Sequence, residues 1–527
     1  MRMTRISRSN LAICFLLASF DPALHAATRT AASCNSVDVQ ATLIAAQAGD
    51  IVVIPAGNCT WTVQVAWAAP ANVTLHGAGS TSIVGGNDQT VISDGYASNA
   101  AILSITTNAS GTFRMYGITF RGGAAGTGHD KWDGIVSIFG NSSQIRVDHS
   151  HFDSTSYSPA LTSGLLEFQG CTAGVVDKNI FDNPVNSVNN SLRLYNGGTC
   201  NNDALGMGDQ SWTQPTGFGT ANFVFVEDNV FNSGAGNDCT KGGRYVWRHN
   251  TMNMTAPAPS VQTHPTGGGA RERGCRAMEI YSNMAIAQSG NYINAFFWIS
   301  SGTALVWDNT FLSSPAGGGT GYRSVISGHE MRYDTSTYTQ IATPNGWGYC
   351  SNHQTGTGSA WDQNTAMGYP CIDQPGRGIG QLLVNDFPSV QNNSTGTIAW
   401  PNQALEPVYE WMSHYSPVPS NPSGIWSEGE SGLVVANRDY YLGTTDSGTP
   451  ITFDGTSGVG SGLSSARPST CTPKVAYWST DTATLYQCSS TNTWSLYYKP
   501  YTYPHPLTQG TGGSQPNAPT NLQLTVQ

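Results

Sequence analysis

One short pattern recurs along the middle of this chain: an apolar residue, two variable residues, usually Asn, one more variable residue, and then usually Phe or Met. It occurs as VDHSHF, VDKNIF, VEDNVF, WRHNTM, IYSNMA and VWDNTF, with marker residues Ser150, Asn179, Asn229, Asn250, Asn283 and Asn309. Successive markers lie 29, 50, 21, 33 and 26 positions apart, so most steps fit one coil of a solenoid and the step of 50 fits two. So short a unit cannot bury its apolar face alone, and the pattern predicts stacked coils around one continuous core.

The composition agrees with a β-rich solenoid. Charged residues make up 11% of the chain, and 60 Gly residues separate short runs rich in Val, Ile, Phe and Tyr, which is typical of an all-β chain dense in turns. The net charge of −10, without a basic stripe, argues against a nucleic-acid partner. A polyanionic ligand would therefore need local cations or metal ions to offset the charge of the whole chain.

The N-terminus predicts export. Residues 1–27 hold a basic segment, an apolar stretch and small residues, which indicate a secretory signal peptide too short to span a membrane. We expect a secreted, monomeric protein, extracellular or periplasmic, without membrane contact. Removing the signal peptide leaves ten of the 11 cysteines, an even number that export would pair. Nearest-neighbour pairing joins Cys34 with Cys59, Cys171 with Cys200, Cys239 with Cys275, Cys350 with Cys371 and Cys471 with Cys488, and the sequence leaves this connectivity open.

The start of the predicted solenoid carries a family pattern. Residues 39–48 indicate a short amphipathic helix, and a GDxVxIPxG pattern follows it at Gly49, Asp50, Val52, Ile54, Pro55 and Gly57. This order of helix, strand and turn resembles the pectate-lyase-like right-handed parallel β-helix proteins, in which the helix caps the open end. The resemblance implies a right-handed parallel β-helix over residues 34–312. That superfamily contains lyases, hydrolases, epimerases and adhesins, so the fold alone does not decide the function.

Composition also divides the chain into segments. We expect a signal peptide at 1–27, the parallel β-helix at 34–312, a loop excursion at 313–380, a C-terminal β-rich extension packed on the helix at 381–507, and a linker and tail at 508–527. Long loops of this kind in a compact protein are usually binding loops or lids.

Strand alternation converts the repeat into a map of faces. The apolar residue that begins each unit is expected to point inward, so the residue after it points outward. Successive parallel strands lie about 4.8 Å apart, so these outward residues are expected to form one column. The column consists of Asp148, Asp177, Glu227, Arg248, Tyr281 and Trp307.

The acidic part of this column predicts a metal site. Carboxylates on neighbouring coils repel each other unless a cation lies between them, so Asp148 and Asp177 form a candidate Ca²⁺ pair. Glu227 is a third candidate ligand, expected two coils further on. The alternative is a solvated acidic face without an ion.

A dense cluster of cations lies between residues 238 and 279. Arg side chains bind carboxylates bidentately, and a cation beside a uronate acidifies its C5 proton, which a neighbouring base then removes. The candidate catalytic residues are Arg244, Arg248, His264, Arg276 and Glu279. The candidate substrate-binding residues are Asp238, Lys241, Arg273, Tyr281 and Trp307. The alternative is a structural salt-bridge network of Arg276, Glu279, Arg273 and Asp238 near Cys239 and Cys275.

Three functions remain open on these observations. The leading one is a polysaccharide lyase that cleaves an acidic, uronate-containing glycan by β-elimination along the outward column. The second is a glycoside hydrolase, which needs two carboxylates about 5 to 9.5 Å apart, with Asp177, Glu227, Asp238 and Glu279 as candidates. The third is a carbohydrate-binding or adhesin-like solenoid without catalysis.

Overall fold

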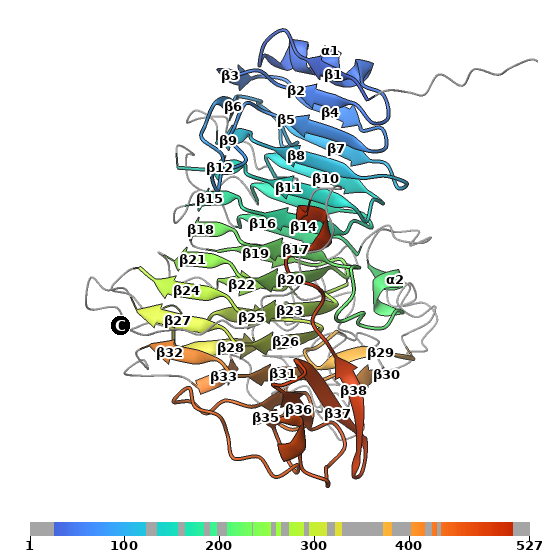
Figure 1. Ribbon diagram of the computed structural model, residues 1–527, viewed down its shortest axis with the longest axis vertical. Coiled ribbons are helices and arrows are strands. Elements are labelled where there is room, and N and C mark those ends of the chain that lie inside the picture. Colours follow the sequence, from blue (N-terminus) through green and yellow to red (C-terminus); the bar gives the residue numbers. More distant parts are fainter. Residues whose placement is uncertain are drawn as a thin grey trace, which may run out of the picture.

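The computed structural model describes residues 26–122, 134–155, 164–183, 190–197, 208–233, 235–254, 260–264, 273–288, 293, 295–313, 322–328, 373–381, 402–416, 424–428 and 434–509. Its strands stack into long parallel sheets that run side by side along one axis (Figure 1). Each complete coil visits the first sheet, then the second, and then either the third or the fourth. The chain is therefore a parallel β-helix, as predicted.

The first sheet has 12 strands. They are β1 (Thr28–Thr30), β2 (Ile51–Val53), β5 (Val73–His76), β8 (Phe113–Tyr116), β11 (Ile145–Asp148), β14 (Gly174–Asp177), β17 (Val224–Glu227), β20 (Arg244–Arg248), β23 (Ala277–Tyr281), β26 (Thr303–Trp307), β31 (Val408–Trp411) and β34 (Tyr440–Leu442). The second sheet has ten strands. They are β3 (Gly57–Trp61), β6 (Thr90–Asp94), β9 (Thr119–Arg121), β12 (His151–Asp153), β15 (Ile180–Asn183), β18 (Val230–Ser233), β21 (Thr251–Met254), β24 (Met284–Ala287), β27 (Thr310–Ser313) and β32 (His414–Ser416).

The third side of the helix is formed by two sheets that meet where β19 contacts β22. The third sheet contains β4 (Val65–Ala68), β7 (Leu103–Thr107), β10 (Val136–Gly140), β13 (Leu166–Gln169), β16 (Leu192–Tyr195) and β19 (Asn237–Cys239). The fourth sheet continues it with β22 (Val261–Gln262), β25 (Phe297–Ile299), β28 (Ser324–Gly328) and β33 (Gly424–Glu428).

The repeat marks both turns and core. Asn179, Asn229, Asn250 and Asn283 form a buried ladder in which each side chain donates to the amide oxygen of the next marker at 2.9 to 3.1 Å. The Phe that follows the marker points inward, and the rings of Phe152, Phe181 and Phe231 stack with centroids 4.9 and 4.8 Å apart. The apolar residues that begin the units are fully buried, namely Val147, Val176, Val226, Trp247, Ile280 and Val306. The inward half of the face map is therefore confirmed.

Two expectations about the coils are wrong, the number of coils in the 50-residue step and the end of the β-helix. The 50-residue step between Asn179 and Asn229 is one coil, because β14 pairs directly with β17 and the additional residues form an excursion after β16. The helix also continues beyond residue 312, because β31 and β34 extend the first sheet and β28 and β33 extend the fourth. Strand pairing therefore passes through the ranges expected to be a loop excursion and a separate extension.

Among the described residues, two α-helices and one antiparallel pair of strands lie outside the main sheets. Helix α1 (Ser36–Ala45) begins earlier than expected, buries Val39 and Leu43, contacts β4 and lies at the N-terminal end of the stack (Figure 1). Helix α2 (Asp209–Trp212) belongs to the excursion after β16. The antiparallel pair β29 (Arg377–Gln381) and β30 (Asn402–Leu405) lies near the other end of the helix.

The C-terminal residues cover the outer face of the first sheet. A four-stranded sheet, β35 (Val459–Gly462), β36 (Ala476–Ser479), β37 (Thr484–Ser490) and β38 (Thr493–Tyr498), packs there through a second apolar cluster that includes Val246, Leu305, Tyr409, Trp478 and Tyr498. Residues 499–509, which we term the C-terminal strap, then run back along the first sheet to β14 (Figure 1), and the strap also accepts hydrogen bonds from Arg146 of β11. The strap ends in the short helix η2 (Pro506–Thr508), and another short helix, η1 (Ser464–Ala466), follows β35.

Three of the expected disulfides are present, Cys34–Cys59, Cys239–Cys275 and Cys471–Cys488. Cys171 is also disulfide-bonded, whereas Cys200, Cys350 and Cys371 lie outside the described residues. Residues 1–25 of the predicted signal peptide lie outside them as well. Among the described helices, none has the length and apolar character needed to cross a membrane.

Candidate functional site

The predicted outward column exists on the first sheet. Strand pairing places Asp148 beside Asp177, Asp177 beside Glu227, Glu227 beside Arg248, Arg248 beside Tyr281 and Tyr281 beside Trp307. We term these six residues the outer column. Glu227 lies one coil from Asp177 and not two, because the 50-residue step is a single coil.

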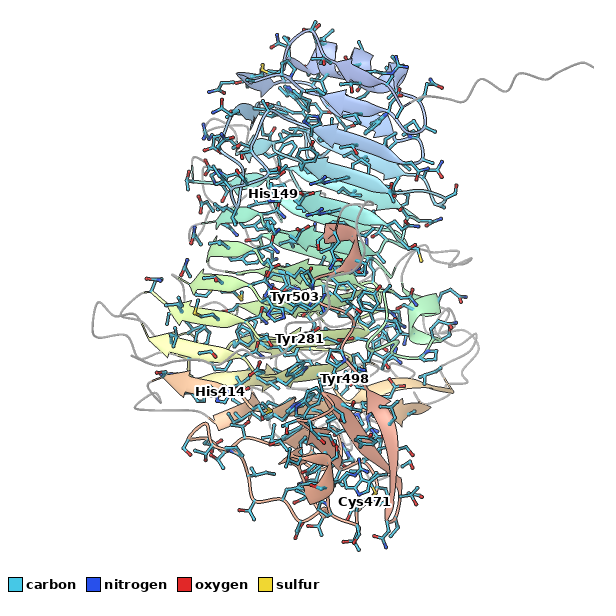
Figure 2. The ribbon with its side chains drawn as sticks, in the orientation of Figure 1. His149, Tyr281, His414, Cys471, Tyr498 and Tyr503 are labelled. Carbon is cyan, nitrogen blue, oxygen red and sulfur yellow. A yellow bond between two sulfur atoms is a disulfide. The ribbon has the colours of Figure 1, made fainter. Side chains whose placement is uncertain are left out.

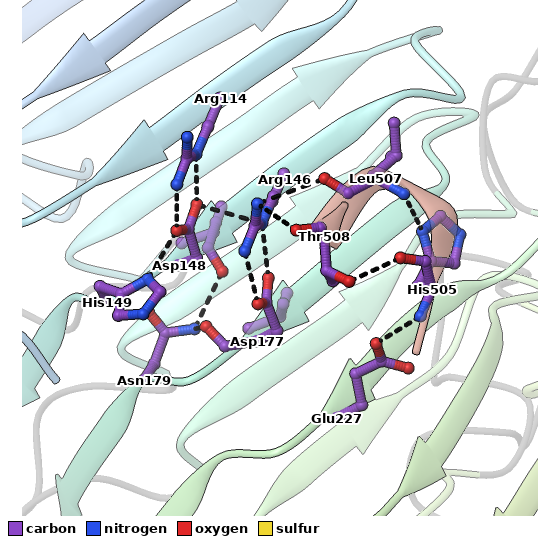
Figure 3. A network of polar contacts seen from close by, with 12 residues as sticks. Arg114, Arg146, Asp148, His149, Asp177, Asn179, Glu227, His505, Leu507 and Thr508 are labelled. Carbon is purple, nitrogen blue, oxygen red and sulfur yellow. Dashed lines mark hydrogen bonds and ion pairs between the residues drawn. The ribbon is translucent and has the colours of Figure 1, made fainter. Parts of the chain in front are cut away.

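The outer column does not face solvent. Asp148, Asp177, Glu227 and Arg248 are 0% exposed. C-terminal residues lie over the column from β14 onward, and Arg114, Arg146 and His149 surround Asp148. Figure 3 shows part of this cover, where the backbone N–H of His505 donates to Glu227 at 2.8 Å. Further along the strap, Arg248 donates to the carbonyl oxygens of Tyr501 and Thr502, both at 2.9 Å. The prediction of an open substrate groove along this column is therefore wrong.

Arginines neutralise the acidic part of the column (Figure 3). Arg114 donates to both carboxylate oxygens of Asp148 at 2.7 and 2.6 Å, and Arg146 donates to both oxygens of Asp177 at 2.9 and 2.8 Å. Burial opposes ionisation of Asp148, but its bonds to Arg114 and His149 outweigh burial and hold its pKa below the usual value. For Asp177 burial outweighs Arg146, and its pKa is raised.

Each carboxylate proposed for Ca²⁺ thus has an arginine beside it, since Arg248 donates to Glu227 at 2.7 Å. Among the described residues, no group of three or more His, Cys, Asp or Glu side chains is arranged to hold a metal ion. The Ca²⁺ site at Asp148, Asp177 and Glu227 stays a prediction, and the repulsion on which it was based is already relieved.

Glu279 and Arg276 are likewise buried. The Glu279 carboxylate accepts hydrogen bonds from the Gly219 N–H and the Tyr498 hydroxyl, both at 2.7 Å, and burial raises its pKa to about 7. Arg276 Nη1 lies 2.7 Å from Glu406 Oε2. Both side chains are 0% exposed, so they are not available to a polysaccharide, which corrects their assignment as catalytic residues.

Three predicted substrate contacts are structural instead. Tyr281 stacks on Trp307 with centroids 4.5 Å apart, and Trp478 of the C-terminal sheet packs against Trp307 at 4.9 Å. Figure 2 shows Tyr281 and Tyr498 on this covered face. Arg273 donates to both carboxylate oxygens of Asp373 at 2.8 and 2.6 Å. The salt-bridge alternative therefore describes this region better, although the partners differ from those expected.

Three further predicted residues, Asp238, Lys241 and His264, meet on the outer face of the third sheet. His264 Nδ1 lies 2.7 Å from Asp238 Oδ1, and the Tyr195 hydroxyl donates to Asp238 Oδ2 at 2.7 Å. Two cations flank the Tyr195 ring, with Arg193 4.4 Å and Lys241 5.2 Å from its centroid. We term Arg193, Tyr195, Asp238, Lys241 and His264 the third-sheet cluster. The His264 side chain is 43% exposed, so the cluster is open to solvent at this end.

Local sequence explains the cluster. Leu192 and Leu194 of β16 point into the core, so Arg193 and Tyr195 between and after them point outward. Pairing of β16 with β19 places Arg193 beside Asp238. Arg193 and Tyr195 were missed as site residues, and the alternation of the LRLY segment would have identified them.

The charges of the cluster fix which nitrogen of the His264 imidazole carries the proton. Burial opposes ionisation of Asp238, but His264 and Arg193 outweigh it and lower its pKa to about 2. An ionised carboxylate beside Nδ1 holds the proton on that nitrogen and leaves Nε2 as the basic nitrogen. Burial, reinforced by Asp238, raises the pKa of Tyr195 far above its usual value, so its hydroxyl keeps its proton.

Aromatic side chains lie on the same side of the helix before and after the cluster. Phe139 of β10 is 38% exposed, and Trp298 of β25 is partly exposed and paired with Gln262. Aromatic rings at exposed positions suit stacking on the apolar faces of sugar rings. Arg244 lies away from this surface, around the corner of the coil at the start of β20.

Comparison with known proteins shows no assigned family. No protein-family model matches the chain, and no curated protein sequence matches it. A solved structure described as the crystal structure of alginate lyase from Paenibacillus sp. str. FPU-7 is similar over 57% of this chain and 99% of that chain, with 16% identity and a TM-score of 0.36. At that score the fold assignment rests on the strand pairing of the chain itself.

Proposed function

We propose that this chain is a secreted enzyme that cleaves a uronate-containing polysaccharide by β-elimination at the third-sheet cluster. The observation that carries the proposal is the contact of the partly exposed His264 with the buried Asp238, whose other oxygen accepts from Tyr195, the ring that Arg193 and Lys241 flank. A base and a cation close together are what removal of a proton next to a carboxylate requires. The disulfides Cys34–Cys59, Cys239–Cys275 and Cys471–Cys488 agree with export.

The proposed reaction assigns one role to each group. Lys241 pairs with the uronate carboxylate and increases the acidity of the C5 proton. His264 Nε2 removes that proton, and Asp238 stabilises the imidazolium that forms. The electron pair from the C5–H bond forms the C4–C5 double bond while the C4–O bond breaks. The imidazolium then returns its proton to the leaving oxygen, so the enzyme ends as it began.

The structure favours elimination over hydrolysis at the residues considered. Hydrolysis requires two carboxyl groups on either side of the glycosidic bond. Of the four carboxylates considered for that role, Asp177, Glu227 and Glu279 lie beneath the C-terminal residues. Asp238 remains beside a candidate substrate surface, but its two oxygens face His264 and Tyr195.

The test is a screen of acidic polysaccharides in which unsaturated products are detected by ultraviolet absorption and new reducing ends are measured in parallel. Elimination raises both signals, hydrolysis raises the second alone, and a binding protein raises neither. On the active substrate, His264→Gln should lower kcat by about 10²-fold or more, the usual contribution of a general base. The matched control is His414→Gln, because the His414 side chain is 53% exposed and lies on the second sheet (Figure 2).

Asp238→Asn tests the orientation of the imidazole. It should lower kcat while leaving KM nearly unchanged, because it affects the tautomer and not substrate contact. Lys241→Met should lower kcat/KM through lost pairing with the carboxylate. Activity that is unchanged in His264→Gln, at an unchanged melting temperature, would remove the catalytic site from the third-sheet cluster.

A further inference from the structure

A pocket of about 550 Å³ lies at the corner between the third and first sheets. Its volume is within the usual range of small-molecule sites, roughly 300 to 1,000 Å³. None of the residues of the third-sheet cluster lines it. Its polar lining includes Asn196, Gln210, Ser211, Gln214, Asn222 and Arg244.

Arg244 is the charged group of this pocket. Its Nε donates to the Ser211 hydroxyl at 3.0 Å, and its Nη2 donates to the Ser211 carbonyl at 2.6 Å. Its Nη1 donates to the carbonyl oxygens of Pro215 and Thr216 at 2.7 and 2.5 Å. Every one of these acceptors is neutral, and within the described part of the chain no carboxylate forms an ion pair with Arg244. A guanidinium has five N–H groups, so these four bonds leave one donor for a ligand.

The surroundings make an anionic ligand favourable here. Burial, followed by the nearby charge of Arg276, lowers the pKa of Arg244 to about 9, because both disfavour its positive form and the charge of Glu406 offsets them only in part. A desolvated cation without an anionic partner is costly, and binding an anion offsets part of that cost. The loop at residues 211–216 already holds the guanidinium in place, so little side-chain entropy would be lost on binding.

We propose that this pocket binds a sugar acid, with its carboxylate on Arg244 and its hydroxyls on the surrounding amides. Gln210, Gln214 and Asn222 carry side-chain amides, which donate and accept hydrogen bonds as sugar hydroxyls do. The choice of a uronate among carboxylated ligands rests on the proposed function. Arg244 follows Asp238 by six residues, a distance of at most about 20 Å along an extended chain, so one polysaccharide can reach both places.

The test measures binding of free glucuronate by calorimetry, because a monosaccharide has no glycosidic bond to cleave. Glucose tests how much the sugar hydroxyls contribute without a carboxylate, and acetate tests how much the carboxylate contributes without the hydroxyls. We expect glucuronate to bind at least tenfold more tightly than either. Ser143→Trp, at an exposed position that lines the pocket, should weaken glucuronate binding at least tenfold. Asn141→Trp, at an exposed position two residues away that does not line it, should leave binding unchanged.

Three results would overturn the proposal. Equal binding of acetate and glucuronate would reduce the pocket to a site for simple anions. Binding that survives Ser143→Trp would place the ligand elsewhere on the chain. Loss of binding in His264→Gln but not in Ser143→Trp would assign the ligand to the third-sheet cluster. Inactivity on every polysaccharide, combined with the expected binding pattern, would refute the proposed function and support the pocket.

Discussion

Replacing Glu279 by Gln should stabilise the protein in a pH-dependent way. The Glu279 carboxyl is buried, and burial raises its pKa from 4.5 to about 7. Between these values the folded state holds a proton that the unfolded state has lost. The carboxyl's contribution to stability is therefore complete below about pH 4.5 and is lost as the pH rises through about 7. A shift of roughly 2.5 units at about 1.4 kcal/mol per unit corresponds to roughly 3 to 4 kcal/mol over the whole titration.

Gln resembles the protonated carboxyl in shape and cannot lose a proton. Its amide oxygen can still accept from the Gly219 N–H, and its NH₂ group can hydrogen-bond the Tyr498 hydroxyl, so the fold should be kept. Relative to the wild type, the free energy of unfolding of Glu279→Gln should therefore increase by roughly 2 to 3 kcal/mol between pH 5 and pH 8, because part of the effect is already lost by pH 5. Glu410, whose pKa burial also raises to about 7, titrates in both proteins and cancels in the difference.

The measurement is urea unfolding of both proteins at several pH values from 5 to 8. The matched control is Asp454→Asn, because Asp454 is exposed and its lowered pKa places its titration below this range. A constant difference between Glu279→Gln and the wild type across the range would refute the burial argument. The same variant should keep full activity, and a large loss of kcat without loss of stability would restore Glu279 to a catalytic role.

Three further predictions concern the covered face of the first sheet. Arg248→Met should destabilise the protein by about 3 to 5 kcal/mol, because it leaves Glu227 buried without its partner. Adding Glu227→Gln should recover most of that loss. An unchanged free energy of unfolding in Arg248→Met would contradict the buried ion pair. Deleting residues 499–527 should lower the melting temperature clearly, whereas deleting 510–527 should not, and equal effects of the two deletions would show that the strap contributes nothing. Chelation of Ca²⁺ should leave the melting temperature unchanged because arginines already neutralise the outer column, and a fall that added Ca²⁺ reverses would support the calcium site.

The direction of each side chain was predictable from the sequence because it depends on neighbouring residues alone. Alternation along a strand correctly placed Val226 inside the helix and Glu227 outside it. Whether an outward residue meets solvent depends instead on segments far away in the chain. The strap residue that bonds Glu227 is His505, which follows it by 278 positions, and no local pattern links the two.

The second feature that the sequence could not predict was the length of the segment that leaves the coil. Residues 196–223 separate β16 from β17 without adding a coil, and spacing alone cannot distinguish such an excursion from an additional coil. The same limit affected the site. His264 and Asp238 were both recognised as functional candidates, but their direct contact depends on how the chain returns after β21.

The strap has a consequence for how the helix comes apart. A solenoid whose coils touch only their neighbours behaves as a one-dimensional array and frays from both ends. Here residues 505–508 bond to Glu227 and to Arg146 on earlier coils, so the C-terminal coils cannot open before the strap is released. The coils from β11 onward are thereby joined into one cooperative unit, while β2, β5 and β8 lie before the first strand that the strap reaches. Native-state hydrogen exchange should therefore be fastest at the N-terminal coils and nearly uniform from β11 to β34.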